Sequence, residues 1–245
     1  MEDMQDPGKK VQDYRDQVIK EGEKMVKDGF PKRIVRLNEI LQSKAFNIPD
    51  LLSLHSDLKI PVPQADFFQP ILDGTRKLDK MECSFTVPGT NVYVLPCGTV
   101  PANDEIVQMI NVVKPLVRQL VEDANLLKIW VSFLIPKIED GNNFGVSIQE
   151  DTLAEIRVVE SEAAAFYDQI SKYFCTRGKI ISKVAKYPHI EDYRKNVQEL
   201  DEKEYLSLRL ILMEVRNHYA TLHDFITKNI EKIQKPRSAN MVNMY

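Results

Sequence analysis

The sequence predicts an all-α protein, an up-down-up-down bundle of four long helices, and three observations support this fold class. Apolar residues recur at helical spacing over four long stretches. Glycine is scarce, with nine residues in a chain of 245. The helical pattern is interrupted mainly in one segment, residues 61–101, which holds six of the 13 prolines. Long helices joined by short turns are typical of an antiparallel four-helix bundle.

The first helix is expected from Lys9 to about Ser43, where apolar residues follow a helical period. We expect a kink or break at Gly29 and Pro31, because an interior proline removes a backbone hydrogen bond and crowds the preceding turn. Pro49 is tolerated in a first turn and predicts a short helix through "DLLSLHSDL".

The second helix carries the clearest pattern, and we expect it from Asn103 to Lys137, capped by Asn103 or Asp104. Its apolar residues alternate by four and three positions, as in the seam of a helical bundle. This seam comprises Ile106, Ile110, Val113, Val117, Leu120, Ala124, Leu127, Val131, Leu134 and Ile138. A second stripe lies beside it, at Met109, Val112, Leu116, Leu126, Trp130 and Phe133. Two stripes predict a second packing partner, and we expect a homo-oligomer.

The third helix is expected from about Val146 to Ala185, and the fourth begins after Pro188 and is stopped by Pro236. The expected organisation has four parts. Residues 1–63 form the first helix and a short following helix, residues 64–101 a flexible insert with a short strand at "NVYVL", residues 102–236 helices two to four, and residues 237–245 a C-terminal tail.

Composition excludes several function classes. The net charge of −3 argues against general nucleic-acid binding, which requires a basic face. We expect no signal peptide, because the N-terminal "MEDMQDPGKK" has no apolar core. We expect no membrane partner, because the chain has no apolar run of 18 residues. The cysteines Cys83, Cys97 and Cys175 form no CxxC pair and predict free thiols in a reducing compartment.

The motifs of enzymes are missing from the sequence. Gly145 is followed by Val146 rather than by the lysine of a phosphate-binding loop, and HExxH and GxSxG do not occur. His218 and His223 are five residues apart, which places them on different sides of a helix. We therefore expect no catalytic residue, no cofactor and no metal. A hydrolase built from helix carboxylates is a weaker hypothesis, because such residues usually form a solvated face.

Two segments are unusual for a plain bundle. The turn within "PKIEDGNNFGVSIQE" contains glycines and asparagines, which tolerate a left-handed backbone. It is either a rigid hairpin, which composition alone favours, or a contact loop. The tail "RSANMVNMY" is either disordered or a ligand whose terminal carboxylate is captured by a partner. In an up-down bundle this turn and this tail lie at the same end, which indicates a docking surface.

Several motifs resemble one known family, the eleven-S proteasome activators or REG family. "IPKIEDGNNFGVSIQE" is similar to the activation loop of that family, and "KYPHIEDYR", "LNEILQS", "HSDLKIPVP" and "LHDFITKNIEKIQKPR" are similar too. The resemblance covers nearly the whole chain except the insert. "VESEAAAFYDQISKY" and "KYPHIEDY" are most similar to the gamma type.

The resemblance implies a non-enzymatic activator of the 20S proteasome. Members form heptameric rings on the outer alpha ring of the proteasome, where C-terminal tails dock and activation loops open the gate without ATP or ubiquitin. By motif position the loop comprises Lys137, Ile138, Glu139, Asp140, Gly141, Asn142, Asn143, Phe144 and Gly145. By the same criterion the anchoring tail comprises Met241, Val242, Asn243, Met244 and Tyr245.

The gamma type also implies residence in the nucleus as well as the cytoplasm, although the insert departs from that type. It offers only Arg76, Lys77 and Lys80 where a dense basic run is usual. The rival hypothesis is a helical oligomeric scaffold or adaptor that binds other proteins through this insert. The intact loop and the terminal tyrosine favour the activator.

Overall fold

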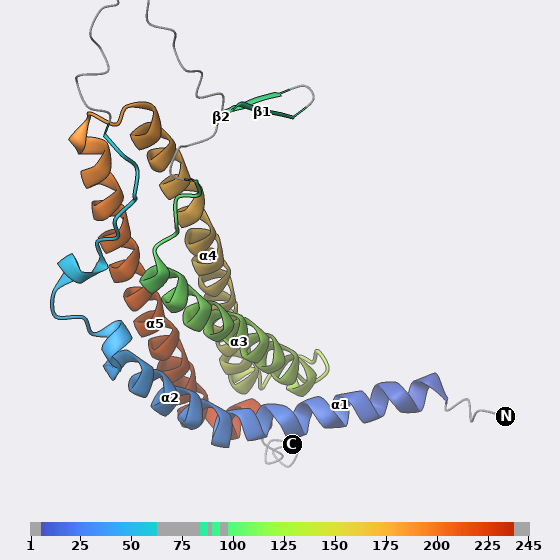
Figure 1. Cartoon of the computed structure of the whole chain (residues 1–245). Coiled ribbons are helices and arrows are strands. Elements are labelled where there is room, and N and C mark those ends of the chain that lie inside the picture. The colour runs from blue at the N-terminus through green and yellow to red at the C-terminus, as the bar shows by residue number, and fades with distance from the viewer. Residues whose placement is uncertain (1–5, 63–83, 88–89, 94–97, 238–245) are drawn as a thin grey trace, which may run out of the picture. The chain divides into compact units, whose positions relative to one another are not determined.

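The computed structural model describes residues 6–62, 84–87, 90–93 and 98–237 (Figure 1). The first long helix consists of α1 (Pro7–Lys24), the π-helical turn η1 (Met25–Gly29) and α2 (Phe30–Gln42). It is followed by two short 3₁₀ turns, η2 (Lys44–Phe46) and η3 (Leu51–Leu54), and by the strands β1 (Ser84–Val87) and β2 (Thr90–Tyr93). Three long helices complete the chain: α3 (Asp104–Leu134), α4 (Phe144–Lys186) and α5 (Glu191–Gln234). The predicted all-helical class with four long helices is confirmed.

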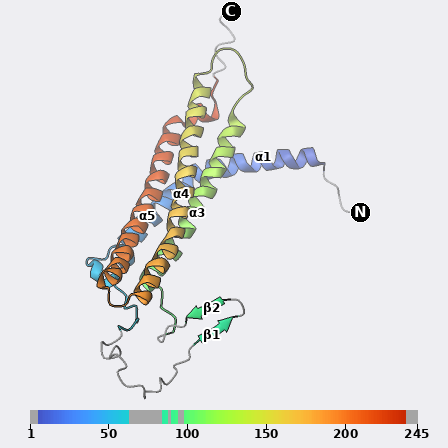
Figure 2. The ribbon, with the colours of Figure 1, turned by 90° about the horizontal axis from the view of Figure 1, so that it is seen from above.

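Contacts divide the chain into two compact units. The first contains residues 1–48, 109–170 and 206–245, and the second contains residues 49–108 and 171–205. Each unit therefore receives parts of α3, α4 and α5. Within the first unit these three helices lie side by side (Figures 1 and 2). Within the part of the chain that the structure describes, no helix is long and apolar enough to cross a membrane.

The predicted interruption of the first helix takes the form of a π turn. The N–H of Phe30 donates to the carbonyl of Met25, five residues earlier, directly before Pro31. Pro31 has no N–H to continue the α-helical ladder, and a widened turn accommodates its ring without ending the helix.

Helix α3 begins as predicted and ends earlier than predicted. The side chain of Asn103 accepts from the N–H of Ile106 at 3.4 Å, which confirms it as the N-cap. The helix ends at Leu134 because the residue before Pro136 is disfavoured in the α conformation. Ile138 is therefore fully exposed, and its predicted place in the seam was wrong.

The core of the first unit is formed by the buried seam residues of α3 from Ile110 to Val131 and by buried residues of the other helices. Part of the second stripe packs within the chain rather than against another subunit. Trp130 is fully buried, and a Cβ added to Gly22 of α1 would lie 2.7 Å from the Cβ of Trp130. Phe30 and Tyr219 pack edge to face with ring centroids 5.2 Å apart. By contrast, residues 6–17 of α1 are exposed, and α1 runs across the direction of α3 (Figure 2).

The second unit is built on a strap, residues 55–62, that packs against α4 and α5. Leu58 and Ile60 of the strap form a buried cluster with Val184 and Val197. The short helix predicted after Pro49 is a single 3₁₀ turn, η3, capped by the side chain of Asp50 at the N–H of Leu52 (2.9 Å).

The insert contributes two strands to the described residues. Strand β2, residues 90–93, agrees in part with the strand expected at "NVYVL". It pairs antiparallel with β1, a strand that was not expected, with Ser84 opposite Tyr93 and Val87 opposite Thr90. Most of the remaining insert, including Arg76, Lys77, Lys80, Cys83 and Cys97, lies outside the described residues, whereas Cys175 is a free, exposed thiol.

Candidate functional site

The turn between α3 and α4 has two successive residues in the left-handed region. Gly141 has φ +82° and Asn142 has φ +48°. The sequence predicted this backbone from the glycine and asparagine pair, because these residues adopt positive φ at the lowest cost. The turn therefore has a specific shape, which most other residues at these two positions would strain.

The side chains of this connection point mainly to solvent. Residues 137–140 are exposed, and Ile138 is fully so. Phe144 opens α4 and is 71% exposed, although it is a large aromatic residue. Two exposed apolar side chains beside charged ones are a reasonable contact surface for another protein.

Arg237 links the connection to the end of α5. Its Nη1 donates to Oε2 of Glu139 at 2.9 Å, and its Nη2 donates to Oδ1 of Asn143 at 3.3 Å. Asn143 in turn donates from its amide to the carbonyl of Glu139 at 3.4 Å. The predicted proximity of the turn and the root of the tail is therefore observed within the first unit.

The buried side chain of Gln149 also stabilises the region where the connection meets the end of α5. Its side chain is fully buried, and its amide nitrogen donates to the carbonyls of Leu134 at 3.1 Å and Ile233 at 2.7 Å. These two carbonyls belong to the last turns of α3 and α5. They accept no hydrogen bond from an N–H of their own helix. One side chain thus joins the ends of two helices to the start of a third.

The predicted loop residues are divided between the connection and the start of α4. Lys137, Ile138, Glu139, Asp140, Gly141, Asn142 and Asn143 lie in the connection, whereas Phe144 and Gly145 lie in the first turn of α4. The predicted tail residues, Met241, Val242, Asn243, Met244 and Tyr245, lie outside the described residues.

Sequence reasoning missed Gln149 and Arg237. A polar residue at a buried helical position is the signal that could have identified Gln149. Arg237 directly follows the helix-stopping Pro236, and nothing local to it indicates a partner almost one hundred positions earlier in the chain.

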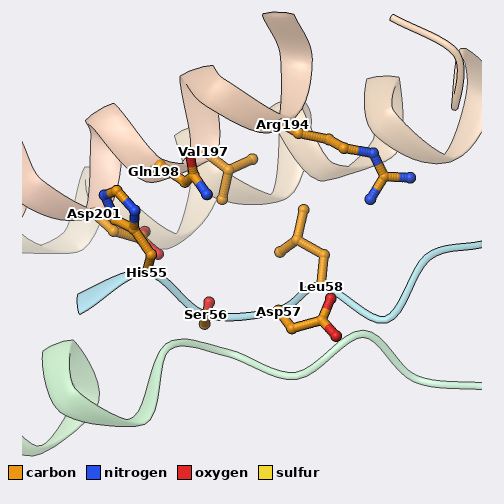
Figure 3. Close-up of a pocket in the computed structure, with 8 residues that line it drawn as sticks. All are labelled: His55, Ser56, Asp57, Leu58, Arg194, Val197, Gln198 and Asp201. Carbon is orange, nitrogen blue, oxygen red and sulfur yellow. The ribbon is translucent and has the colours of Figure 1, made fainter. Parts of the chain in front are cut away.

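A cavity of about 350 Å³ in the second unit is the other candidate site (Figure 3). His55, Asp57, Arg194 and Asp201 supply its charged or titratable groups. Each of them has a partner within the unit: His55 contacts Glu202, Asp57 accepts from the N–H of Lys59, and Arg194 donates to the carbonyl of Ile60.

Asp201 is the centre of the polar contacts beside this cavity. It is 1% exposed and accepts from Asn103 at 2.8 Å, Tyr173 at 2.8 Å and Arg177 at 2.9 Å. Burial and the adjacent Asp201 carboxylate raise the pKa of Tyr173, which remains a donor. Arg177 also donates to the hydroxyl of Ser56 at 3.2 Å, which ties the strap to these polar contacts. We therefore interpret the cavity as part of the structural framework rather than as a reaction centre.

Comparisons with known proteins match most of the chain to one family. Residues 5–65 match the family model "Proteasome activator PA28, N-terminal", and residues 99–243 match "Proteasome activator PA28, C-terminal". The chain is 51% identical over 243 residues to human proteasome activator complex subunit 3, covering 96% of this chain and 95% of the relative. It is 38% identical over 237 residues to human subunit 2, covering 97% and 94%.

A solved structure has the same fold over nearly the whole length of this chain. The crystal structure of the 11S subunit of the Plasmodium falciparum proteasome, PA28, superposes with a TM-score of 0.75 at 29% identity, covering 97% of this chain and 99% of that one. The match of both family models, the identity to two curated subunits and the shared fold lead to one conclusion: the chain belongs to the PA28 family of proteasome activators.

Proposed function

We propose that this protein is a non-enzymatic activator that assembles into a homo-heptameric ring and docks on the outer alpha ring of the 20S proteasome. In this proposal Met241–Tyr245 of each subunit anchor the ring, and Lys137–Gly145 open the gate. Activation requires neither ATP nor ubiquitin. The observation that carries the proposal is the contact of Arg237 with Glu139 and Asn143, because it brings the loop to the root of the tail.

Exposed apolar residues support the assembly of several copies. In the first unit they lie on α1 at Val11 and Tyr14, on α4 at Val158, and on α5 at Leu206 and Leu210. Such residues on several helices of one chain favour packing against neighbouring subunits, since large exposed apolar areas are costly in water. The number seven rests on the family resemblance. Native mass spectrometry showing only a monomer at micromolar concentration would contradict the ring.

A ring also explains how a short tail can anchor a large complex. A single extended segment binds weakly, but several tails presented together gain avidity through their high effective concentration. Helix α5 ends at Gln234, before Pro236, so we expect the subunit to fold without residues 241–245.

The deciding experiment measures fluorogenic peptide hydrolysis by purified 20S proteasome with and without this protein, in the absence of ATP. We expect stimulation by the full chain and none by a chain that lacks residues 241–245. The truncated chain is expected to remain a ring that no longer co-sediments with the proteasome. If the full chain neither binds nor stimulates, the protein is instead a scaffold of the same fold.

The gamma-type resemblance supports residence in the nucleus, where we place at least part of the protein. Imaging of a tagged full chain tests this, and exclusion from the nucleus would contradict it. The variant Arg76→Gln/Lys77→Gln/Lys80→Gln tests whether the basic residues of the insert contribute to import.

A further inference from the structure

Arg237 is more buried and better connected than its place beside a chain terminus suggests. Its side chain is only 20% exposed, whereas that of its partner Glu139 is 63% exposed. The guanidinium reaches two different acceptors, a carboxylate and an amide oxygen, in a segment almost one hundred positions earlier in the chain. A planar guanidinium with several donors is suited to hold two acceptors in a fixed relative position.

The backbone on both sides of this contact is already held tightly. Gln149 joins the ends of α3 and α5, and Gly145 approaches the backbone of Pro236 so closely that an added Cβ would lie 2.5 Å from the Cα of Pro236. The loop and the root of the tail therefore belong to one packed region. Arg237 is the point at which that region reaches the exposed part of the loop.

We propose that Arg237 is a positioning residue, which couples the root of the tail to the loop so that the docked tail holds the loop in its active placement. This inference rests on the proposed function and assigns a role that neither the loop nor the tail has alone. Docking then does more than raise the local concentration of the ring. It fixes residue 237, and through Glu139 and Asn143 it fixes the turn.

The proposal predicts a separation of binding from activation. Arg237→Gln leaves residues 241–245 unchanged, so the concentration of ring that gives half-maximal stimulation is expected to stay within about twofold of that of the wild type. Maximal stimulation is expected to fall at least about fivefold, because a misplaced catalytic or regulatory group loses far more than its own contact energy.

A matched control removes the same charge two positions earlier. Lys235 is exposed, so Lys235→Gln tests the loss of a positive charge beside the tail without touching the loop. It is expected to behave as the wild type. The charge exchange Glu139→Arg with Arg237→Glu recreates an ion pair and is expected to recover part of the lost stimulation.

Hydrogen–deuterium exchange of the isolated ring provides a readout that needs no proteasome. The amides of residues 137–145 are expected to exchange faster in Arg237→Gln and at the wild-type rate in Lys235→Gln. The exchange rates test the contact of Arg237 with the loop even if the wild-type ring does not stimulate the proteasome. A lack of stimulation by the wild type would refute the proposed function but not this contact.

Three outcomes would overturn the coupling. The first is wild-type maximal stimulation together with wild-type exchange in Arg237→Gln. The second is a raised half-maximal concentration with normal maximal stimulation, which would make Arg237 part of the docking contact. The third is an equal loss in Lys235→Gln, which would show that only net charge matters.

Discussion

Gly145 packs directly against the backbone of Pro236, so closely that a Cβ on Gly145 would lie 2.5 Å from the Cα of Pro236. The second glycine of "GNNFG" thus serves a different purpose from the first. Gly141 permits a left-handed backbone, whereas Gly145 lies in a helix and permits a close approach of two chain segments. Both requirements fall on the connection between the loop and the root of the tail.

Gly145→Ala is expected to disturb this contact. The neighbouring atoms are backbone and cannot rotate away, so the variant must shift α4 or the tail root, at a cost of about 1–3 kcal/mol in the free energy of unfolding. We expect a lower melting temperature and reduced stimulation of the proteasome.

Gly178→Ala is the matched control in the same helix. A Cβ at Gly178 meets nothing within 4 Å, so alanine is expected to stabilise the helix by about 0.5–1 kcal/mol. A Gly145→Ala variant that melts no earlier than the wild type would contradict the close approach.

The left-handed turn gives a second prediction, which separates shape from side-chain contact. Gly141→Val is expected to lose stimulation most severely, since a β-branched residue resists positive φ. Asn142→Ala is also strained, by about 1 kcal/mol, because the residue has φ +48°. Asn142→Gly removes the same amide but keeps the backbone relaxed.

We expect all three variants to bind the proteasome normally and to stimulate it less than the wild type does. Recovery in Asn142→Gly but not in Asn142→Ala would assign the role to the shape of the turn rather than to the amide. Normal hydrolysis by every variant at saturating binding would make the turn a simple connector between helices.

Much of the fold could be predicted from the sequence because it depends on local patterns. The seam of α3 follows from apolar spacing, and its start follows from the capping side chain of Asn103. The end of α3 was predicted too late, because the apolar rhythm continues to Ile138 while Pro136 stops the helix. Local stereochemistry overrode periodicity there.

The contacts between distant segments could not be predicted in the same way. Trp130 fits the pattern of a second stripe, but only the packing of Gly22 against it shows that this part of the stripe is covered within the chain. In the candidate site, the left-handed turn was foreseen from residue types. The acceptors of Arg237 and Gln149 depend on how the ends of α3 and α5 meet the start of α4, which no local signal encodes.

The polar centre of the second unit gives a third prediction. Asp201 accepts from Arg177, which is itself 4% exposed, so Asp201→Ala leaves a buried guanidinium without its carboxylate. Such a loss is expected to cost about 3–5 kcal/mol. Tyr173→Phe removes one donor to the same carboxylate and is expected to cost about 1 kcal/mol.

Chemical denaturation of both variants measures these free energies. Equal and small losses would show that Asp201 is not the centre of the network. Because the network fixes the strap, proteolysis within residues 55–62 is expected to quicken in Asp201→Ala more than in Tyr173→Phe.

The last prediction concerns pH and the neighbouring carboxyl of Glu204. This residue is 7% exposed, its Oε1 has no hydrogen-bond partner among the described residues, and burial raises its pKa from 4.5 to about 7, with Lys203 lowering it and Asp201 raising it further. Between pH 4.5 and about 7 the folded state holds more of this proton than the unfolded state. The contribution of Glu204 to stability therefore falls as the pH rises through this window.

Glu204→Gln removes the titration and keeps the shape of the side chain. Relative to the wild type, its melting temperature is expected to be nearly unchanged below pH 4.5 and to rise progressively up to about pH 8. At about pH 8 the free energy of unfolding of the variant is expected to exceed that of the wild type by about 1 kcal/mol. This is less than the full pKa shift would give, because nearby water screens part of the cost of ionising Glu204. Glu199→Gln changes an exposed carboxylate of the same helix and is expected to show no such trend. The prediction is contradicted if the two melting temperatures differ by the same amount at every pH. In that case Glu204 is ionised throughout, and the difference in stability comes from replacing the side chain rather than from its proton.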